Sequence, residues 1–539
     1  MITEIALENV RIFQGAGWAF NLPPLTVICG TNSSGKSTVL KSLLLLRQSQ
    51  GLRESSEESH GRLRFFGSEV DLGSYQSFVS RNNQSLDITL SLNIKDKIDK
   101  SFLSSAAPRK RNAKRPARES QDYHLKSTFV FGMQRVAPQV SPFFVDLDDV
   151  RDNEDANSEK QLGLLKKASF EVFQENRPVL SWHVESTWNK PGGEKNVERF
   201  EALIPRKILQ DWFGTIGRLG LSELGDGADK DFARFEVRLR GLLPSSLRVK
   251  IPSGKLKGLK DSISRLVDWP LPPPIEYTLG DLRRALSRIH YLGPLRTPAK
   301  RYYIAHLDAN PSMDSEGEFL PYVLRGKRGA NVLGILLKKP SESHKETLTQ
   351  ALNSWLYYFR SGQRIEDASH VREIELEETK GVLLELRLQG QGGRERHALA
   401  DSGFGYSQVL PILVRALLAE PGDTIIIEQP ELHLHPALQV RLAEFFVEMV
   451  RLGKQVLIET HSEHLVNAIR VLAAEDSTGY IANNCGIVFV DFDKGTPQIR
   501  RLEIQPDGTI PEWPSSFFGD SLGLAGRLLK AQSRTKHSE

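Results

Sequence analysis

The sequence contains very little cysteine and no long apolar run. Cys29 and Cys485 are its only cysteines among 539 residues, which excludes a framework of several disulfides and favours a reducing compartment. No apolar stretch approaches the ~20 residues that a membrane-spanning helix needs, and the first residues lack the basic start and apolar core of a secretory signal. We therefore expect a cytoplasmic protein that does not associate with membranes.

The sequence also lacks a strong charge of either sign. Its formal net charge is +4, which does not by itself identify a protein that binds nucleic acid. Six basic residues are nevertheless concentrated in the run 109–118, and an acidic block follows at 146–155. The basic run is typical of a solvated loop and also suits contact with the phosphates of DNA or RNA. Both interpretations stay open, because the acidic block can neutralise the basic one.

The most informative motif is a glycine-rich loop at residues 30–38, GTNSSGKST, which fits the pattern G-x-x-x-x-G-K-[ST]. An apolar run at 25–29, typical of a strand, precedes the loop, and the leucine-rich segment 39–44, typical of a helix, follows it. In such a loop backbone N–H groups cradle phosphate oxygens, Lys36 reaches the β and γ phosphates, and the Ser37 hydroxyl holds Mg²⁺. The chain is therefore predicted to bind ATP or GTP. The residues expected to contact the nucleotide here are Asn32, Ser33, Ser34, Gly35, Lys36, Ser37 and Thr38.

Two further apolar strands are expected far along the chain, and each ends in polar residues. The run 424–428 ends in Glu428, and the run 455–459 leads into Thr460, His461 and Ser462. A carboxylate at the carboxyl end of a strand beside the phosphate loop can ligate Mg²⁺. A polar residue after the other strand can touch the γ phosphate or the attacking water. We therefore expect these strand ends to lie beside the glycine-rich loop.

In this order, the motifs resemble the ABC-type ATPases of the RecF, SMC and OLD group. The likeness is greatest to bacterial AAA family ATPases of the AAA_15 kind, in which the strings IEQPELHLHP and ETHSEHL are typical. The resemblance covers residues 1–50 and about 285–520 and implies an α/β fold, an ABC-type P-loop ATPase head with an inserted arm or helical region. It implies that Lys36 and Ser37 form the Walker A site, Glu428 the Walker B carboxylate, and His461 the switch histidine. Ser37 and Glu428 are then the expected ligands of Mg²⁺, and ATP the expected nucleotide.

The segment 402–408, which precedes an apolar helix, resembles the signature segment of these ATPases. Ser402, Gly403 and Gly405 are its residues expected to contact nucleotide. In that group the signature segment of one subunit completes the nucleotide site of another. The resemblance therefore implies a homodimer, or a higher homo-oligomer, with ATP sandwiched between subunits.

One residue departs from the pattern of the group. Most ABC ATPases have a glutamate after the Walker B carboxylate that polarises the attacking water, whereas this chain has Gln429. A glutamine can position water but cannot accept its proton, so assistance worth about 10²–10⁴ in rate is missing unless another group supplies it. Glu431 is the expected substitute, with His461 or Glu459 as alternatives. We expect slow hydrolysis, or a nucleotide-held dimer that acts as a switch, with Glu428, Gln429, Glu431 and His461 as the catalytic set.

The resemblance also suggests a biological setting. ATPases of this kind are often encoded beside nucleases or other toxic effectors in antiphage defence systems, which implies a protein that senses or grips a macromolecule and regulates a separate effector. Two alternatives stay open: a RecF-like DNA repair clamp, and a scaffold that binds ATP without hydrolysing it. Asp491 and Asp493 could suggest the TOPRIM nuclease of OLD proteins, but a hairpin over 487–504 is the favoured interpretation, and the nuclease or toxin is expected to be a partner.

Length and composition predict two to four domains, at about 100–200 residues each. We expect an N-terminal ATPase lobe at 1–96, an insertion or arm at 97–285, a C-terminal ATPase lobe at 286–525 and a flexible tail at 526–539. The insertion shows no sustained heptads, which argues against a long coiled coil. Gln48 and Gln76 are both candidates for the glutamine that senses Mg²⁺ and the γ phosphate.

Overall fold

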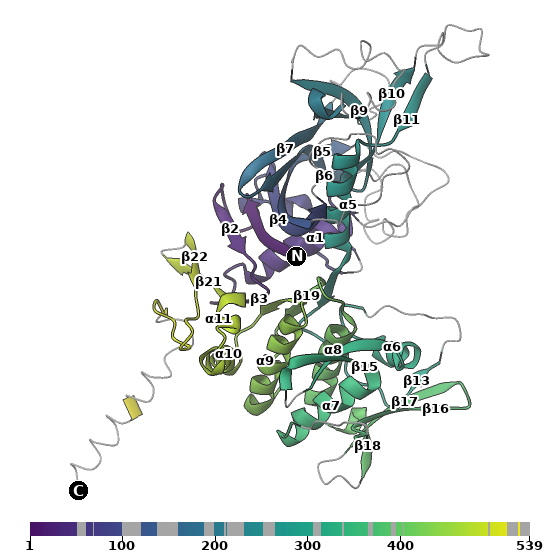
Figure 1. Ribbon diagram of the computed structural model, residues 1–539, viewed down its shortest axis with the longest axis vertical. Helices are drawn as coiled ribbons and strands as arrows, with labels where there is room; N and C mark the ends of the chain where they lie inside the picture. The colour runs from purple at the N-terminus through teal and green to yellow at the C-terminus, as the bar shows by residue number, and fades with distance from the viewer. Residues whose placement is uncertain are drawn as a thin grey trace. The chain divides into compact units, whose positions relative to one another are not determined.

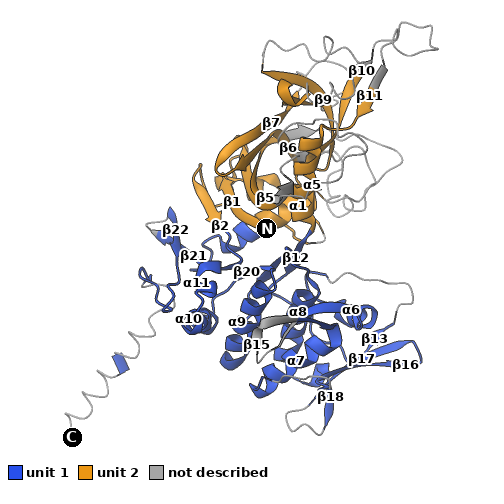
Figure 2. Ribbon diagram, viewed as in Figure 1, with its two compact units in different colours: residues 1, 22–40, 288–539 blue, residues 2–21, 41–287 orange. Residues whose placement is uncertain are grey.

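The computed structural model describes residues 1–50, 61–67, 69–99, 120–136, 160–187, 199–209, 212, 231–251, 265–305, 314–336, 339–364, 370–389, 395–402, 404–493, 496–514 and 527–528. The chain divides into two compact units (Figure 2). Unit 1 comprises Met1, Leu22–Leu40 and Arg288–Glu539, and unit 2 comprises Ile2–Asn21 and Lys41–Ser287. Each unit therefore combines segments that are distant in sequence.

Unit 1 contains most of the helices (Figure 1). In chain order its elements are β3 (Leu25–Gly30), the start of α1 (Lys36–Gln50), β12 (Ile289–Leu292), β13 (Tyr303–Ile304), α6 (Leu320–Lys327), β14 (Asn331–Leu336), β15 (Lys339–Thr347), α7 (Leu348–Ser361), β16 (Ile374–Thr379), β17 (Leu383–Gln389), β18 (Arg396–Ala398), α8 (Phe404–Leu418), β19 (Thr424–Glu428), α9 (Pro436–Arg451), β20 (Gln455–Glu459), α10 (Glu463–Glu475), α11 (Tyr480–Asn484), β21 (Cys485–Asp493) and β22 (Thr496–Leu502).

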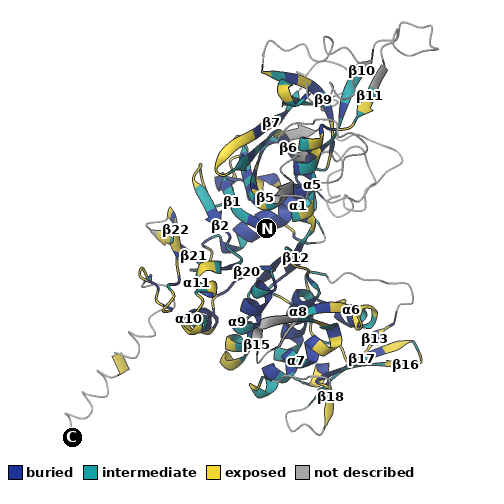
Figure 3. Cartoon of the chain, viewed as in Figure 1, coloured by how far each residue is buried: buried dark blue, intermediate teal, exposed yellow. Residues whose placement is uncertain are grey.

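The centre of unit 1 is a six-stranded sheet with the order β12-β19-β20-β3-β21-β22. All neighbouring strands run parallel except β21 and β22, which form an antiparallel hairpin. Every residue of β19 and β20 is buried, as expected for parallel strands covered on both faces (Figure 3). The predicted α/β class, the strands at 25–29, 424–428 and 455–459, and the C-terminal hairpin are all confirmed.

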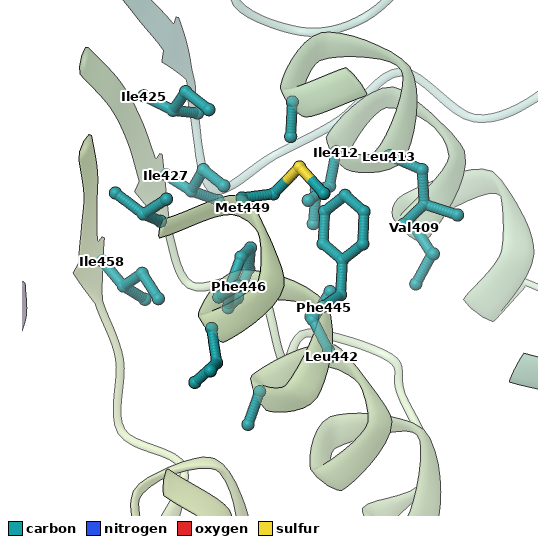
Figure 4. Packing of buried hydrophobic residues seen from close by; sticks show 14 of the residues in the cluster. Val409, Ile412, Leu413, Ile425, Ile427, Leu442, Phe445, Phe446, Met449 and Ile458 are labelled. Atoms are coloured by element: carbon teal, nitrogen blue, oxygen red, sulfur yellow. The ribbon is translucent and has the colours of Figure 1, made fainter. Parts of the chain in front are cut away.

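The apolar faces of α8 and α9 pack beside this sheet (Figure 4). Phe445, Phe446 and Met449 of α9 lie in one cluster with Ile427 of β19 and Val409 of α8. All of these side chains are at most 1% exposed. Burying an aromatic or aliphatic side chain fully contributes about 1.5–3 kcal/mol, so this cluster fixes α8 firmly next to the strand that ends in Glu428.

Unit 2 is built around a ten-stranded antiparallel sheet with the order β11-β10-β9-β8-β7-β6-β5-β4-β1-β2. Its strands are β1 (Ile2–Glu8), β2 (Trp18–Asn21), β4 (Ile88–Asp99), β5 (Ser120–Val136), β6 (Lys160–Gln174), β7 (Arg177–Thr187), β8 (Arg199–Pro205), β9 (Phe232–Arg240), β10 (Leu243–Ile251) and β11 (Arg265–Trp269), with the helices α2 (Tyr75–Phe78) and α5 (Pro273–Ser287). Buried and exposed residues alternate along β9, as in a strand with one solvated face. The described part of the expected insertion 97–285 is thus mostly strand, and not a helical region.

Several sequence-based predictions are not tested by the described residues. The basic run 109–118 and the acidic block 146–155 lie outside them, as does all of the tail 526–539 except 527–528. The four domain boundaries stay predictions, although the one at 285/286 falls close to the division between the units at Ser287. Within the described residues, no helix is both long and apolar enough to span a membrane.

Candidate functional site

The glycine-rich loop connects the buried strand β3 to α1. Gly30 has a φ of +142°, and a Cβ there would lie 1.9 Å from the carbonyl oxygen of Val490 on β21. Only glycine therefore fits at the end of this strand. Ser33 and Gly35 also adopt positive φ, of 60° and 88°, so the loop is curved tightly over the start of α1.

The charged side chain of the loop is held inside it. Lys36 is 4% exposed, and its Nζ donates hydrogen bonds to the carbonyl oxygens of Thr31 at 2.6 Å and Gly30 at 3.3 Å. Burial lowers the pKa of Lys36, an effect that the nearby Glu459 carboxylate opposes. The Ser34 hydroxyl is buried without a hydrogen-bond partner in the described residues. A phosphate group bound in the loop would accept hydrogen bonds from both the Lys36 ammonium and the Ser34 hydroxyl.

Oxygen ligands gather at the carboxyl ends of β19 and β20. Glu428 and Glu459 are paired in the parallel register, and the Ser37 hydroxyl donates to Glu459 Oε1 at 2.8 Å. Hydroxyl and carboxylate oxygens are ligands that Mg²⁺ prefers. Among the described residues, no group of three or more His, Cys, Asp or Glu side chains could hold a metal ion. In nucleotide sites Mg²⁺ usually takes most of its ligands from water and phosphate oxygens, with one or two carboxylates from the protein.

Gln429, which stands where most ABC ATPases have a glutamate, lies in the turn after Glu428. Gln429 has a φ of 45°, and its backbone N–H donates to the carbonyl oxygen of Glu459 at 2.7 Å. Two residues later, Glu431 Oε1 accepts a hydrogen bond from the backbone N–H of His461 at 2.7 Å. The turn is thus tied to the end of β20 at two points, and the structure brings Gln429, Glu431 and His461 together.

The second carboxylate oxygen of Glu431 is buried and has no hydrogen-bond partner within the described residues. Burial raises the pKa of Glu431, while the hydrogen bond from His461 acts in the opposite direction. The His461 side chain is exposed, and its pKa is lowered by partial desolvation and by the positive charge of Lys36. A carboxylate with a raised pKa and a neutral imidazole are both suited to accept a proton near neutral pH.

The predicted signature segment lies at the start of α8. Gly403 is outside the described residues. The Ser402 hydroxyl donates to the carbonyl oxygen of Leu399 at 2.8 Å, and a Cβ on Gly405 would approach the carbonyl oxygen of His433 to 3.3 Å. The start of α8 therefore lies against the turn that follows Glu428 in the same unit.

Tyr291 of β12 and Arg296, which follows that strand, contact Glu428, although neither was among the residues predicted for the site. The Tyr291 hydroxyl donates to Glu428 Oε1 at 3.0 Å, and Arg296 Nη2 donates to the carbonyl oxygen of Glu428 at 2.9 Å. Arg301, farther along the same segment, pairs with Asp401 at 2.7 Å. The sequence could have indicated Tyr291, because the hydroxyl of a tyrosine in a buried strand usually needs a hydrogen-bond partner.

The two candidate sensor glutamines have different surroundings in unit 2. Gln48 Nε2 donates to the carbonyl oxygen of Arg64, and its Oε1 accepts from the Val70 N–H at 3.4 Å. Gln76 is exposed. Gln48 therefore supports the chain around residues 64–70, and neither glutamine is assigned to the site.

Comparisons with known proteins match both parts of the site. A family model described as "AAA domain" matches residues 4–179, which include the glycine-rich loop. A second, described as "AAA ATPase domain", matches residues 337–466, which include α8, Glu428 and His461. No curated protein matches the sequence.

Among solved structures, the chain is similar to SMC head domains. One is an SMC head from Thermotoga maritima, with 9% identity, a TM-score of 0.34, and coverage of 93% of this chain and 99% of that one. Another is an SMC head with an extended coiled coil, bound to the C-terminal domain of ScpA and derived from Pyrococcus furiosus, with 10% identity, a TM-score of 0.32 and 99% coverage of both chains. TM-scores this low describe only a loose superposition.

Proposed function

We propose that the chain, which matches an AAA domain and an AAA ATPase domain, is a slowly hydrolysing, dimeric ATPase of the ABC type. In this proposal the ATP-bound dimer senses or grips a macromolecule and regulates a separate effector in antiphage defence. The proposal of slow hydrolysis is supported by two residues that follow Glu428. Gln429 stands where a base is expected, and Glu431 has a buried, unpartnered carboxylate oxygen two residues later.

Nucleotide binding rests on the loop and the strand ends. Lys36 exchanges its two carbonyl partners for phosphate oxygens, and the Ser34 hydroxyl gains an acceptor. Ser37, Glu428 and Glu459 supply oxygens on the side of the sheet where Mg²⁺ would be held. Mg²⁺ held by these residues would supply positive charge to neutralise the phosphate groups.

Proton transfer is assigned to Glu431. Gln429 can hold the attacking water by its amide, and Glu431 accepts the proton as the water attacks the γ phosphate. Desolvation raises the pKa of this carboxyl, which brings its basicity closer to working pH. His461 would touch the γ phosphate or the same water, and its backbone hydrogen bond to Glu431 supports this role.

Single-turnover ATP hydrolysis tests this assignment. We expect the wild type to hydrolyse ATP and the Glu431→Gln variant to lose about 10²–10⁴ in rate while still binding nucleotide. Lys36→Ala should lose binding, and Glu475→Gln, which changes an exposed glutamate of α10, serves as the matched control. Equal rates for the wild type and Glu431→Gln would exclude Glu431 as the base.

The same samples test the dimer by light scattering. We expect ATP with Mg²⁺ to double the mass of the wild type and to leave Lys36→Ala monomeric. A larger species without any phosphate release would favour the alternative of a non-hydrolysing scaffold, for which Gln429 is the supporting observation. Stimulation of the ATPase by DNA in the absence of a partner would favour the RecF-like alternative.

The defence role and the separate effector rest on the family resemblance alone. Nucleic-acid contact is assigned to the basic run 109–118, whose charges suit a phosphate backbone. A test is protection of cells against phage by the gene together with its genomic neighbours, compared with the Lys36→Ala and Glu431→Gln variants. Equal protection by all three forms would exclude an ATP-controlled role.

A further inference from the structure

The segment between Tyr291 and Arg296 lies between the strand that carries Glu428 and the signature helix. We propose that Arg296 is a positioning residue that transmits nucleotide occupancy from Glu428 to helix α8 within a single chain. The proposal rests on the proposed function for its ligand, ATP. It adds a role to a residue that the family resemblance leaves unassigned.

The first support is the unusual environment of the Arg296 side chain. It is 4% exposed, yet only Nη2 has a hydrogen-bond acceptor, the carbonyl oxygen of Glu428. Nε and Nη1 are buried and have no partner among the described residues. Buried polar groups are nearly always hydrogen-bonded, and leaving one unsatisfied is costly. A guanidinium with two such donors therefore suits a partner that arrives from outside the chain.

The second support is the chemistry of what could arrive. The acid with the largest influence on Arg296 is Glu431, whose Oε2 is likewise buried without a hydrogen-bond partner in the described part of the chain. Burial lowers the pKa of Arg296 to about 10, so the neighbouring acids compensate its charge incompletely. An oxygen acceptor that comes with the nucleotide would satisfy these N–H groups and hold the side chain in one position.

The third support is the connection from Arg296 to α8. Gln408 of that helix is 2% exposed, and its Nε2 donates to the carbonyl oxygen of Arg296 at 3.3 Å. Arg415 on the same helix donates to the carbonyl oxygens of Asp314 at 3.1 Å and Tyr291 at 3.5 Å. The segment 291–296 is therefore fastened to α8 on one side and to Glu428 on the other.

Together these contacts form a continuous polar path. It leads from the carbonyl of Glu428 through the Arg296 side chain and backbone to Gln408 on α8. Because α8 begins with the signature segment, fixing Arg296 would fix the surface that the family resemblance assigns to a second subunit. Nucleotide bound in one chain would thus prepare that chain for its partner.

Hydrogen exchange measured by mass spectrometry on the intact protein tests the path. The samples contain Mg²⁺ with and without a non-hydrolysable ATP analogue, at a concentration where light scattering shows no change in mass. In the wild type we expect the analogue to slow exchange in both the loop 30–38 and the first turns of α8. In Arg296→Met the loop should remain protected, whereas protection of α8 should fall by roughly 2- to 30-fold.

Two further variants make the result decisive. Gln408→Leu keeps the guanidinium and removes the bond to α8, so it should lose α8 protection alone, even if Arg296→Met folds poorly. Arg500→Met changes an exposed arginine of β22 and should behave like the wild type. Unchanged α8 protection in both Arg296→Met and Gln408→Leu would overturn the proposal. An unprotected loop in the wild type would instead overturn nucleotide binding itself, and this proposal with it.

Discussion

At the scale of single residues, the three glutamates of the site differ in what holds them. Glu428 accepts from the Tyr291 hydroxyl, Glu459 from the Ser37 hydroxyl, and Glu431 from the His461 backbone. Each hydrogen bond fixes the position of one carboxylate oxygen. The second oxygen of the same carboxylate is oriented as a result. Tyr291, which lies outside the recognised motifs, thus sets the geometry of Glu428 inside them.

Tyr291 provides a direct test of this arrangement. Tyr291→Phe removes the hydroxyl that orients Glu428, and losing such a supporting bond typically costs about 10–100-fold in metal affinity or activity. We expect the Mg²⁺ concentration needed for half-maximal ATP hydrolysis to rise within that range. Mg²⁺ titration of the ATPase rate measures it, and Tyr302→Phe, at an exposed tyrosine, should leave the value unchanged. An identical Mg²⁺ requirement in both variants would contradict the role of Tyr291.

Glu448 of α9 gives a prediction about stability and pH. It is 4% exposed, its Oε2 has no hydrogen-bond partner in the described residues, and Arg451 lies at 3.6 Å. Burial raises the pKa of Glu448 to about 7. Because the folded protein binds this proton more tightly than the unfolded chain, the stabilisation is complete below the unfolded pKa and is lost as the pH rises through 7.

Glu448→Gln should therefore stabilise unit 1 by about 1–3 kcal/mol at pH 8 and change it little near pH 4. Thermal unfolding at the two pH values measures the difference. Glu475→Gln, an exposed change on α10, is the control and should shift neither midpoint. A destabilised Glu448→Gln variant at pH 8 would mean that the ion pair with Arg451 outweighs the cost of burial.

At the scale of elements, local sequence determines where the helices of unit 1 begin. Thr347 caps α7 by accepting a hydrogen bond from the Gln350 N–H, and the Gln350 side chain accepts from the Thr347 N–H at 3.0 Å. These two hydrogen bonds give acceptors to two backbone N–H groups that have no partner within the helix. Gly362, with a φ of 73°, ends the same helix.

Thr347→Ala should consequently destabilise unit 1 by about 0.5–2 kcal/mol. Chemical denaturation followed by far-ultraviolet circular dichroism measures this loss. Thr379→Ala, at the exposed end of β16, changes the same residue type without removing a cap and should have a smaller effect. If both variants unfolded at the same denaturant concentration, the cap would contribute nothing.

Some elements were predictable from sequence because their signals are local. β19 and β20 are short strands with three consecutive apolar residues each, and each ends in a glutamate. The loop 30–38 contains its own glycines. The path from Arg296 to Gln408 was not predictable, since it depends on which strand lies beside β19. The long strands of unit 2 were missed for a related reason: their alternating pattern gives a register only once the partner strand is known.

At the scale of the whole molecule, the nucleotide site is assembled from distant parts of the chain. The strand β3 lies between β20 and β21, and the Ser37 and Glu459 side chains that meet there are 422 residues apart in sequence. The AAA domain and AAA ATPase domain matches fall on separate stretches for the same reason. Changes in either stretch should therefore affect one and the same site.

The position of β3 has a consequence for how the protein is made. A ribosome that has just released the glycine-rich loop has not yet produced either of the strands that flank β3, and Asp491, which accepts from the Thr31 hydroxyl, follows 460 residues later. At about 5–20 residues per second, that interval lasts roughly 20–90 s. During translation the loop therefore has no sheet to hold it in shape, and the site proposed for nucleotide can form only after β20 and β21 have been synthesised.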